Sequence, residues 1–386
     1  RQDAALQAGH FNDFLFVSLF RAAFLGAIRG AGEDGLSSDR LGVAVFKALG
    51  FDRPGEQGMR SEWLVDPELE GANLINAQKA MRQVLSYRAW FDQRRGWRFT
   101  NPNLEQLGLV RVNYLGLADL CADETKFAGA PNLLAGVDPA ARMKAYTVLL
   151  DAMRQGLAID PEVLDTAEQE SVRSRSINTL RAPWGLGREE QMRSARFLML
   201  YPPARRGNSI ADEEKLLRAG HLSGLGRELR KPDNWGGRLE ARHLKRNDYI
   251  QLLERMLAVA AKAGLVSQVP TPFGDAMGWQ LKNACVEFHA GDGTSARGGM
   301  DNSYFRSLYD NLARAIGAEF HHFSFEAREH TAQVDKDRRE AREMRFRYGT
   351  EDQQRLAAMT NELRQLGEHQ RFLPVLFCSP TMELGV

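Results

Sequence analysis

The residues best suited to chemistry lie near the end of the sequence, where Pro374 precedes a short apolar run at residues 375–377. A run of this kind predicts a buried parallel strand. It leads into Ser379, Pro380 and Thr381, a polar turn at the carboxyl end of that strand. In open α/β sheets this edge binds ligands and phosphates. We therefore expect a ligand-binding edge at this turn.

A second polar pair, His330 and Thr331, lies within a β-rich run expected at residues 319–334. A charged helix is expected next, at residues 335–347, and its six bases against four acids predict a mostly solvated face. The alternative for His330 is a histidine satisfied at a strand end. The alternative for Thr381 is a turn hydroxyl that bonds its own backbone.

Together these elements resemble superfamily 2 nucleic-acid helicases. Residues 379–386 resemble motif V of that family, with Thr381 in the threonine place and Glu383-Leu384-Gly385 in the middle. In the family, an upstream strand delivers His-x-Gly/Ala-hydrophobic and a helix of the form Arg-x-x-x-Glu-x-x-Phe follows. This sequence matches those positions in order, with Ala332 where glycine is more usual and an insertion at residues 349–370; the matching residues are His330, Arg339, Glu343 and Phe346.

This resemblance implies an ATP-dependent DNA helicase or translocase, in which two lobes open and close while stepping along one strand. Thr381 and Ser379 would belong to the phosphate grip, and Gly385 would allow close backbone approach. Glu383 would couple the grip to the nucleotide site. His330, Thr331 and Arg339 would also face the nucleic acid.

The sequence contains neither a G-x-x-x-x-G-K-[ST] loop nor a D-E-x-H/D acid pair. ATP and Mg²⁺ are therefore expected in an intact parent protein, and this fragment alone is expected to be inactive. The sequence starts at Arg1 and ends within motif V, and both features also predict a fragment of a larger protein. Phage-defence helicases of the Druantia kind and mitomycin-repair-type helicases are the suggested relatives, with protein partners from a defence or repair system.

Two groups of basic and aromatic residues are candidates for a nucleic-acid surface, because arginines bind phosphates and tryptophans stack on unpaired bases. The first group is Arg88, Trp90, Arg94, Arg95, Trp97 and Arg98. The second is Arg227, Arg230, Lys231, Trp235, Arg238, Arg242, His243, Lys245 and Arg246. We expect binding at Arg238, Arg242 and Lys245 of the second group. The alternative for both groups is a solvated helix face with core tryptophans.

The elements that must position these residues predict a mixed α and α/β fold, mostly helical. Helices are expected at residues 11–31, 73–94, 139–158, 160–182, 247–263, 304–316, 335–347 and 351–371. Winged-helix-like units are expected near 33–114 and 216–289, the second with hairpin strands at 265–269 and 278–288. An exposed loop or linker is expected at 201–209. The predicted domains are 1–125 (helical, winged-helix-like), 126–215 (helical, with linker), 216–300 (winged-helix-like, with a Gly-rich joint) and 301–386 (a partial second RecA-like parallel-sheet lobe).

Composition sets wider limits. With 386 residues, 43% hydrophobic content and a net charge of +1, the sequence fits a soluble multidomain protein and excludes no class of partner. Cys121, Cys285 and Cys378 lie far apart, which favours a reducing cytoplasm and no metal site. The apolar stretch 14–28 contains Ser18 and Arg21, so no membrane association is expected.

A second class of function fits the same sequence: a non-enzymatic DNA-binding or scaffold module of tandem winged helices. A Walker lysine upstream and a Q/H-R-x-G-R-x-G-R run downstream in the parent reading frame would distinguish the helicase from it.

Overall fold

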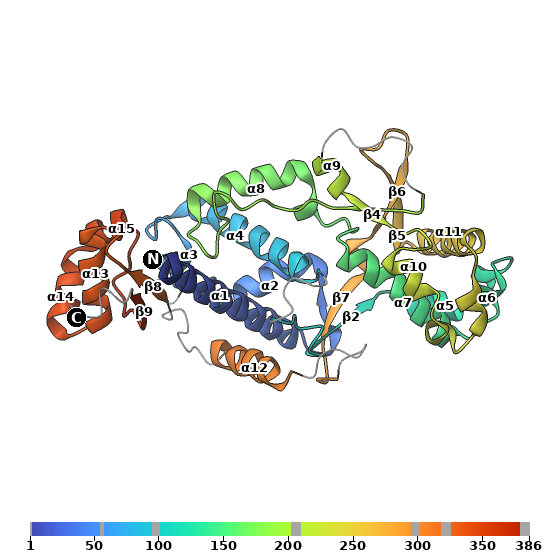
Figure 1. Ribbon diagram of the computed structural model, residues 1–386, viewed down its shortest axis with the longest axis horizontal. Coiled ribbons are helices and arrows are strands. Elements are labelled where there is room, and N and C mark those ends of the chain that lie inside the picture. The colour runs from blue at the N-terminus through green and yellow to red at the C-terminus, as the bar shows by residue number, and fades with distance from the viewer. Residues whose placement is uncertain are drawn as a thin grey trace. The chain divides into compact units, whose positions relative to one another are not determined.

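The computed structural model describes residues 2–54, 58–94, 101–201, 210–294, 302–317 and 326–378. The chain divides into two compact units. The terminal unit consists of Arg1–Gly26 with Ser307–Val386, and the central unit of Ala27–Arg306. Helices α1 (Gln2–Gly30) and α12 (Ser303–Gly317) run across the two points of division. The fold is mixed α and α/β with small sheets, as the sequence predicted (Figure 1).

Helices dominate the central unit. In chain order they are α2 (Leu41–Ala48), α3 (Arg60–Trp63), α4 (Gly71–Asp92), α5 (Leu117–Ala122), α6 (Asn132–Ala135), α7 (Pro139–Gln155), α8 (Thr166–Thr179), α9 (Ile210–Glu214), α10 (Gly224–Leu229) and α11 (Arg246–Lys262). Helix α7 begins where Asp138 accepts a hydrogen bond from the Ala141 amide at 2.8 Å. Helix α8 begins later than predicted because its N-cap is Asp165, which accepts from two backbone amides.

Two small sheets complete the central unit. The first is antiparallel, in the order β1 (Leu36–Ser37), β7 (Val286–Ala290), β2 (Val110–Tyr114). The second has the order β4 (Leu216–Arg218), β3 (Phe197–Met199), β6 (Met277–Leu281), β5 (Val266–Pro270). In it β3 and β4 are parallel and the other pairs antiparallel. Strand β2 belongs to the predicted domain 1–125 and β7 to the predicted domain 216–300, and the two strands pair in one sheet.

The hairpin predicted after α11 forms in part. Strands β5 and β6 pair antiparallel, from Val266 opposite Leu281 to Pro270 opposite Met277. The second strand was predicted to extend to residue 288, which is wrong. A short 3₁₀ turn at Asn283–Cys285 ends the pairing, and the chain resumes as β7 in the other sheet. The winged-helix assignment stays a prediction.

The terminal unit contains a β-α-β arrangement. Strand β8 (Ala327–His330) is followed by α13 (Lys336–Arg347), α14 (Thr350–Ala358) and α15 (Thr360–Leu366), and then by β9 (Val375–Cys378). The two strands pair in parallel, from Ala327 opposite Val375 to His330 opposite Cys378. This pairing confirms the prediction that these two strands lie side by side.

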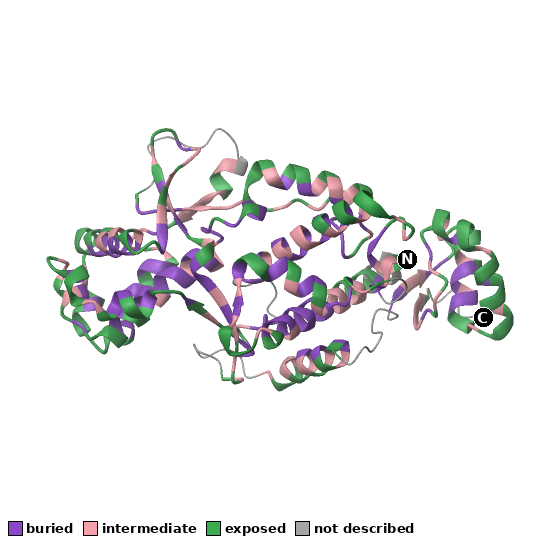
Figure 2. Cartoon of the chain, turned by 180° about the vertical axis from the view of Figure 1, so that it is seen from behind, coloured by how far each residue is buried: buried purple, intermediate pink, exposed green. Residues whose placement is uncertain are grey.

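Strand β9 is less enclosed than its apolar sequence predicted. Its residues are half-buried or exposed, and within the described ranges it pairs with β8 alone. The core of the β-α-β arrangement lies on α13 and its neighbours, at Ala341, Met344, Leu356 and Leu363. Most of α14 and α15 is exposed (Figure 2). The helices therefore cover the sheet mainly through α13.

Helix α1 is more apolar than the sequence analysis assumed. Its segment Gln7–Gly30 has a mean hydropathy of 1.5, long and apolar enough to cross a membrane, and 61% of that window is buried. A mostly buried core helix of a soluble protein has the same properties. Ser18 and Arg21, expected to oppose insertion, are buried, and Arg21 Nη1 donates to Tyr309 Oη at 2.9 Å. Localisation in the cytoplasm stays a prediction.

Candidate functional site

The parallel register of β8 and β9 brings two predicted residues to one sheet edge. His330 lies opposite Cys378, and Thr331 follows His330. The side chains of His330 and Thr331 are buried, with 1% and 2% exposure. The other expected residues of this edge follow Cys378 and lie outside the described residues; they are Ser379, Thr381, Glu383 and Gly385.

The polar side-chain atoms of this pair lack hydrogen-bond partners in the part of the chain that the structure describes. Both ring nitrogens of His330 and Thr331 Oγ1 are buried without a partner among the described residues. Glu343 Oε1 lies 3.1 Å from His330 Nε2, a close charge contact that lacks hydrogen-bond geometry. An unsatisfied buried polar group costs about 1–3 kcal/mol. A satisfied histidine and a ligand contact therefore both stay predictions for His330.

Helix α13 supplies the rest of the predicted constellation. Glu343 contacts His330, as described, and Arg339 is half-buried on the preceding turn. Arg339 Nε has no hydrogen-bond partner in the described part of the chain. Phe346, by contrast, is 47% exposed. The helix thus places Glu343 on the side of the strand edge, while Phe346 contributes little to the core.

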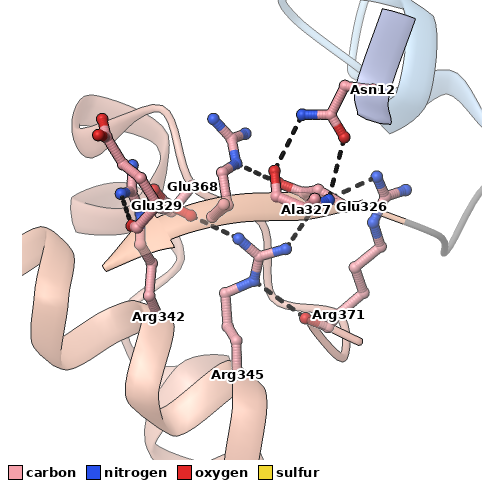
Figure 3. Close-up of polar contacts among 9 residues, drawn as sticks. Asn12, Glu326, Ala327, Glu329, Arg342, Arg345, Glu368 and Arg371 are labelled. Carbon is pink, nitrogen blue, oxygen red and sulfur yellow. Dashed lines mark hydrogen bonds and ion pairs between the residues drawn. The ribbon is translucent and has the colours of Figure 1, made fainter. Parts of the chain in front are cut away.

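The solvated face predicted for α13 is wrong on one side of the helix. Arg345 has no exposed surface, and its Nη2 lies 2.6 Å from Glu326 Oε2. Its Nη1 pairs with Glu368, and Arg342 Nε lies 2.7 Å from the same carboxylate (Figure 3). Arg342 and Arg345 are three residues apart, beside Ala341 and Met344. This spacing places them on one helix face, which composition alone did not indicate.

This ionic network, defined as Glu326, Arg328, Arg342, Arg345, Glu368 and Arg371, joins the start of β8 to α13 and to the segment before β9. Arg345 Nε also donates to the Arg371 carbonyl oxygen at 3.0 Å. Asn12 of α1 completes the arrangement, because its amide nitrogen donates to the Ala327 carbonyl oxygen at 2.9 Å (Figure 3). The Asn12 side-chain oxygen accepts from the Ala327 amide at 3.0 Å. The network thereby fixes the strand that carries His330.

The network predicts a loss of stability in acid. Burial alone would raise the pKa of Glu326, but Arg328 and Arg345 hold it well below its usual range. A carboxyl with a depressed folded-state pKa stabilises the fold above its unfolded pKa of about 4.5, and this contribution is lost as the pH falls below that value. We expect the melting temperature, followed by circular dichroism from pH 6 to pH 3, to fall more steeply for the native protein than for Glu326→Gln. Parallel curves for the two proteins would contradict this.

The second basic group splits into two parts. Trp235 is fully buried and donates from Nε1 to the Leu229 carbonyl oxygen at 2.7 Å, so it cannot stack on a base. Arg230 donates to the Gly226 carbonyl oxygen at 3.1 Å, and Lys231 pairs with Glu228 at 2.8 Å. The burial of Trp235 agrees with the core tryptophan of the alternative, and Arg230 and Lys231 are held by contacts within the protein.

The remaining part, residues 238–246, is the basic segment. Arg238 donates to the carbonyl oxygen of Gly136, which ties it to the fold. The side chains of Arg242 and Lys245 are exposed and have no hydrogen bond or ion pair in the described residues; those of His243 and Arg246 share this property. Lys245 is the N-cap of α11, so the positive end of the helix dipole adds to the field. This surface can hold phosphates.

Two members of the first basic group, Arg88 and Trp90, make structural contacts. Arg88 Nη1 lies 3.0 Å from Glu190 Oε1, and its Nη2 donates to the Gly185 carbonyl oxygen at 3.1 Å. Trp90 is fully buried and packs edge-on against Phe288. Arg95, Trp97 and Arg98 lie outside the described residues. The sequence analysis did not identify a further group of residues that line one pocket, namely Tyr201, Arg218 and Leu222. The local sequence indicates this group only by its position at or after the ends of short strands.

The three cysteines form no disulfide within the described part of the chain. Burial raises the pKa of Cys121 to about 11 and that of Cys285 to about 12. Both thiols are therefore protonated near neutral pH and resist thiolate chemistry. Cys378 is exposed.

Comparisons of this chain with protein-family models, with curated proteins and with solved structures gave no match.

Proposed function

We propose that this chain is part of an ATP-dependent nucleic-acid helicase or translocase, with DNA as the expected substrate. The observation that carries the proposal is the parallel pairing of β8 with β9 across a helical connection. Carboxyl ends of adjacent parallel strands meet at one edge, where phosphates commonly bind. Cys378 ends β9 opposite His330, and the motif V residues follow Cys378 in the sequence.

In the proposed mechanism this chain grips nucleic acid and transmits the grip between lobes. His330 and Thr331 would contribute polar atoms that lack partners among the described residues, and Glu343 would orient the imidazole. ATP with Mg²⁺ would supply the energy of stepping when bound to the parent protein. The phosphate loop and acid pair that hold them do not occur in this sequence.

The basic segment would act as a second grip. Arg242, Lys245 and Arg246 are exposed cations with no competing carboxylate partner among the described residues. Cations in such surroundings bind phosphates irrespective of base sequence. This part of the proposal is independent of the helicase resemblance, because a scaffold or winged-helix module would use the same surface.

The motif V assignment predicts a specific loss of activity. In the intact parent, Thr381→Ala is expected to lower DNA-stimulated ATPase and unwinding by about tenfold or more, since one hydrogen bond to a charged phosphate contributes about 1.5–3 kcal/mol. The fold should survive, because a turn hydroxyl contributes little to a core. ATPase with and without DNA measures the effect, and Thr381→Ser, which keeps the hydroxyl, is the matched control.

Unchanged stimulated ATPase in an active parent carrying Thr381→Ala would reject the motif V assignment. The non-enzymatic DNA-binding or scaffold module would then be the better proposal.

A further inference from the structure

A pocket in the central unit lies at the carboxyl ends of the parallel strands β3 and β4. Its volume is about 390 Å³, within the range of about 300–1,000 Å³ typical of small-molecule sites. Met199, Leu200 and Leu216 give it an apolar lining, and Tyr201, Arg218 and Leu222 also line it. Crevices at the carboxyl ends of parallel strands are common ligand sites.

Two large apolar side chains of this pocket remain open to solvent. Tyr201 is 54% exposed and Leu222 is 79% exposed. The Tyr201 hydroxyl donates to Glu254 Oε1 at 2.8 Å, which holds the ring in one orientation against α11. This hydrogen bond raises the pKa of Tyr201, whereas the neighbouring Arg246 guanidinium acts in the opposite direction. The ring is thus a fixed, exposed aromatic platform.

The pocket adjoins the basic segment. His221 Nε2 lies 2.9 Å from the Leu244 carbonyl oxygen, and the Tyr249 hydroxyl donates to the Ala219 carbonyl oxygen at 2.8 Å. These contacts hold the loop after β4 against the start of α11, where Lys245 and Arg246 are exposed. Arg218 at the end of β4 adds a further exposed cation. An apolar pocket with an aromatic platform therefore opens beside several cations.

We propose that this pocket, called here the tyrosine pocket, binds one unstacked base of a single-stranded nucleic acid, with the adjacent phosphates on Arg218 and Arg246. The assignment rests on the proposed nucleic-acid function and names the form of nucleic acid that it recognises. A base provides the flat apolar surface that matches the lining, and its phosphates provide the negative charge that matches the rim. A base within a duplex cannot reach the platform.

Recognition in the tyrosine pocket is expected to be tolerant of sequence. The Tyr201 hydroxyl is bonded to Glu254, and Ser223 Oγ, also in the lining, accepts from the Gly226 amide at 3.0 Å. These groups are therefore committed within the protein. Stacking on an aromatic ring works for every base, because each has a π face.

The test uses this chain and a fluorescein-labelled oligothymidylate, followed by fluorescence anisotropy. Stacking of one base contributes about 1–3 kcal/mol, so Tyr201→Leu should weaken binding about 5- to 150-fold. Tyr201→Phe keeps the ring and is the matched control, expected within about threefold of the native chain. An abasic strand of equal length should bind the native chain and Tyr201→Leu equally, and a duplex should do the same.

The outcomes separate this proposal from the function on which it rests. If the native chain binds neither single strands nor duplex at low salt, the nucleic-acid function and the tyrosine pocket both fail. If it binds oligothymidylate and Tyr201→Leu binds equally well, only the pocket assignment is overturned. Equal losses for Tyr201→Leu on the oligothymidylate and the abasic strand would also overturn it, because the ring would then act without a base.

Discussion

Replacing Arg345 with methionine is expected to destabilise the terminal unit by about 3–5 kcal/mol. Arg345 is fully buried and pairs with the carboxylates of Glu326 and Glu368, which are 7% and 0% exposed as side chains. Methionine fills a similar volume but leaves both carboxylates without this cation. Glu326 keeps Arg328 and Arg371, and Glu368 keeps Arg342, but both carboxylates lose the fully buried cation that joins them. Removing one partner from a buried ion pair costs more than the pair contributes, so the loss should exceed that of an exposed substitution.

Hydrogen exchange measured by mass spectrometry resolves this effect by region. Peptides from β8 and α13 should exchange about 10²- to 10⁴-fold faster in Arg345→Met, and peptides from α7 serve as an internal reference. Arg338→Met is the matched control, because Arg338 lies on the same helix and is exposed. Its effect should stay within about 0.5 kcal/mol. Native protection of β8 and α13 in Arg345→Met would show that the ionic network does not hold this unit.

The sequence sufficed for the β-α-β arrangement because its signals are local. A proline, an apolar run and a polar turn marked β9, and helical periodicity marked the segments between it and β8. Chirality and short connections favour parallel pairing of two strands joined by helices. Even so, β9 is half-buried, because its enclosure depends on neighbours that its own sequence does not specify.

Burial of the charged residues could not be predicted in the same way. Arg342 and Arg345 belong to a helix rich in charge, and composition placed them in solvent. Their burial depends on Glu326 and Glu368, which come from segments on either side of α13. The opposite error concerns Trp235. Its basic neighbours in the sequence suggested an exposed ring that stacks on bases, but tertiary packing buries it.

Pairing between strands that lie far apart in the sequence could not be predicted either. Strands β2 and β7 each follow local turn signals, but nothing local indicates that Val112 lies opposite Phe288. The tyrosine pocket depends on the same kind of information. Tyr201 opens a segment predicted as a loop or linker, and its ring is oriented by Glu254 of α11. Long-range pairing, not local propensity, builds this candidate site.

Reversing the charge of Arg242, Lys245 and Arg246 to glutamate is expected to weaken binding of single-stranded DNA by about 100-fold or more at 0.1 M salt. On single-stranded DNA each lost phosphate contact removes about 0.7 units from the dependence of log affinity on log salt, so the slope should fall by about two for the three residues. The loss should be similar for different base sequences. Arg238 stays unchanged, because its guanidinium donates to the Gly136 carbonyl oxygen and its reversal would disturb the fold.

A filter-binding titration at several salt concentrations measures both quantities. The matched control reverses Lys47, Lys79 and Lys262, which are exposed residues of the same unit and give the same change in net charge. Both triple variants change the net charge equally, so any effect of total charge is the same in both. A larger loss in the variant of the basic segment therefore indicates a local phosphate-binding surface. The control should therefore stay within about threefold of the native affinity. Equal losses in the two variants, or none in either, would mean that the basic segment is a solvated face, and the proposed grip at α11 would fall with it.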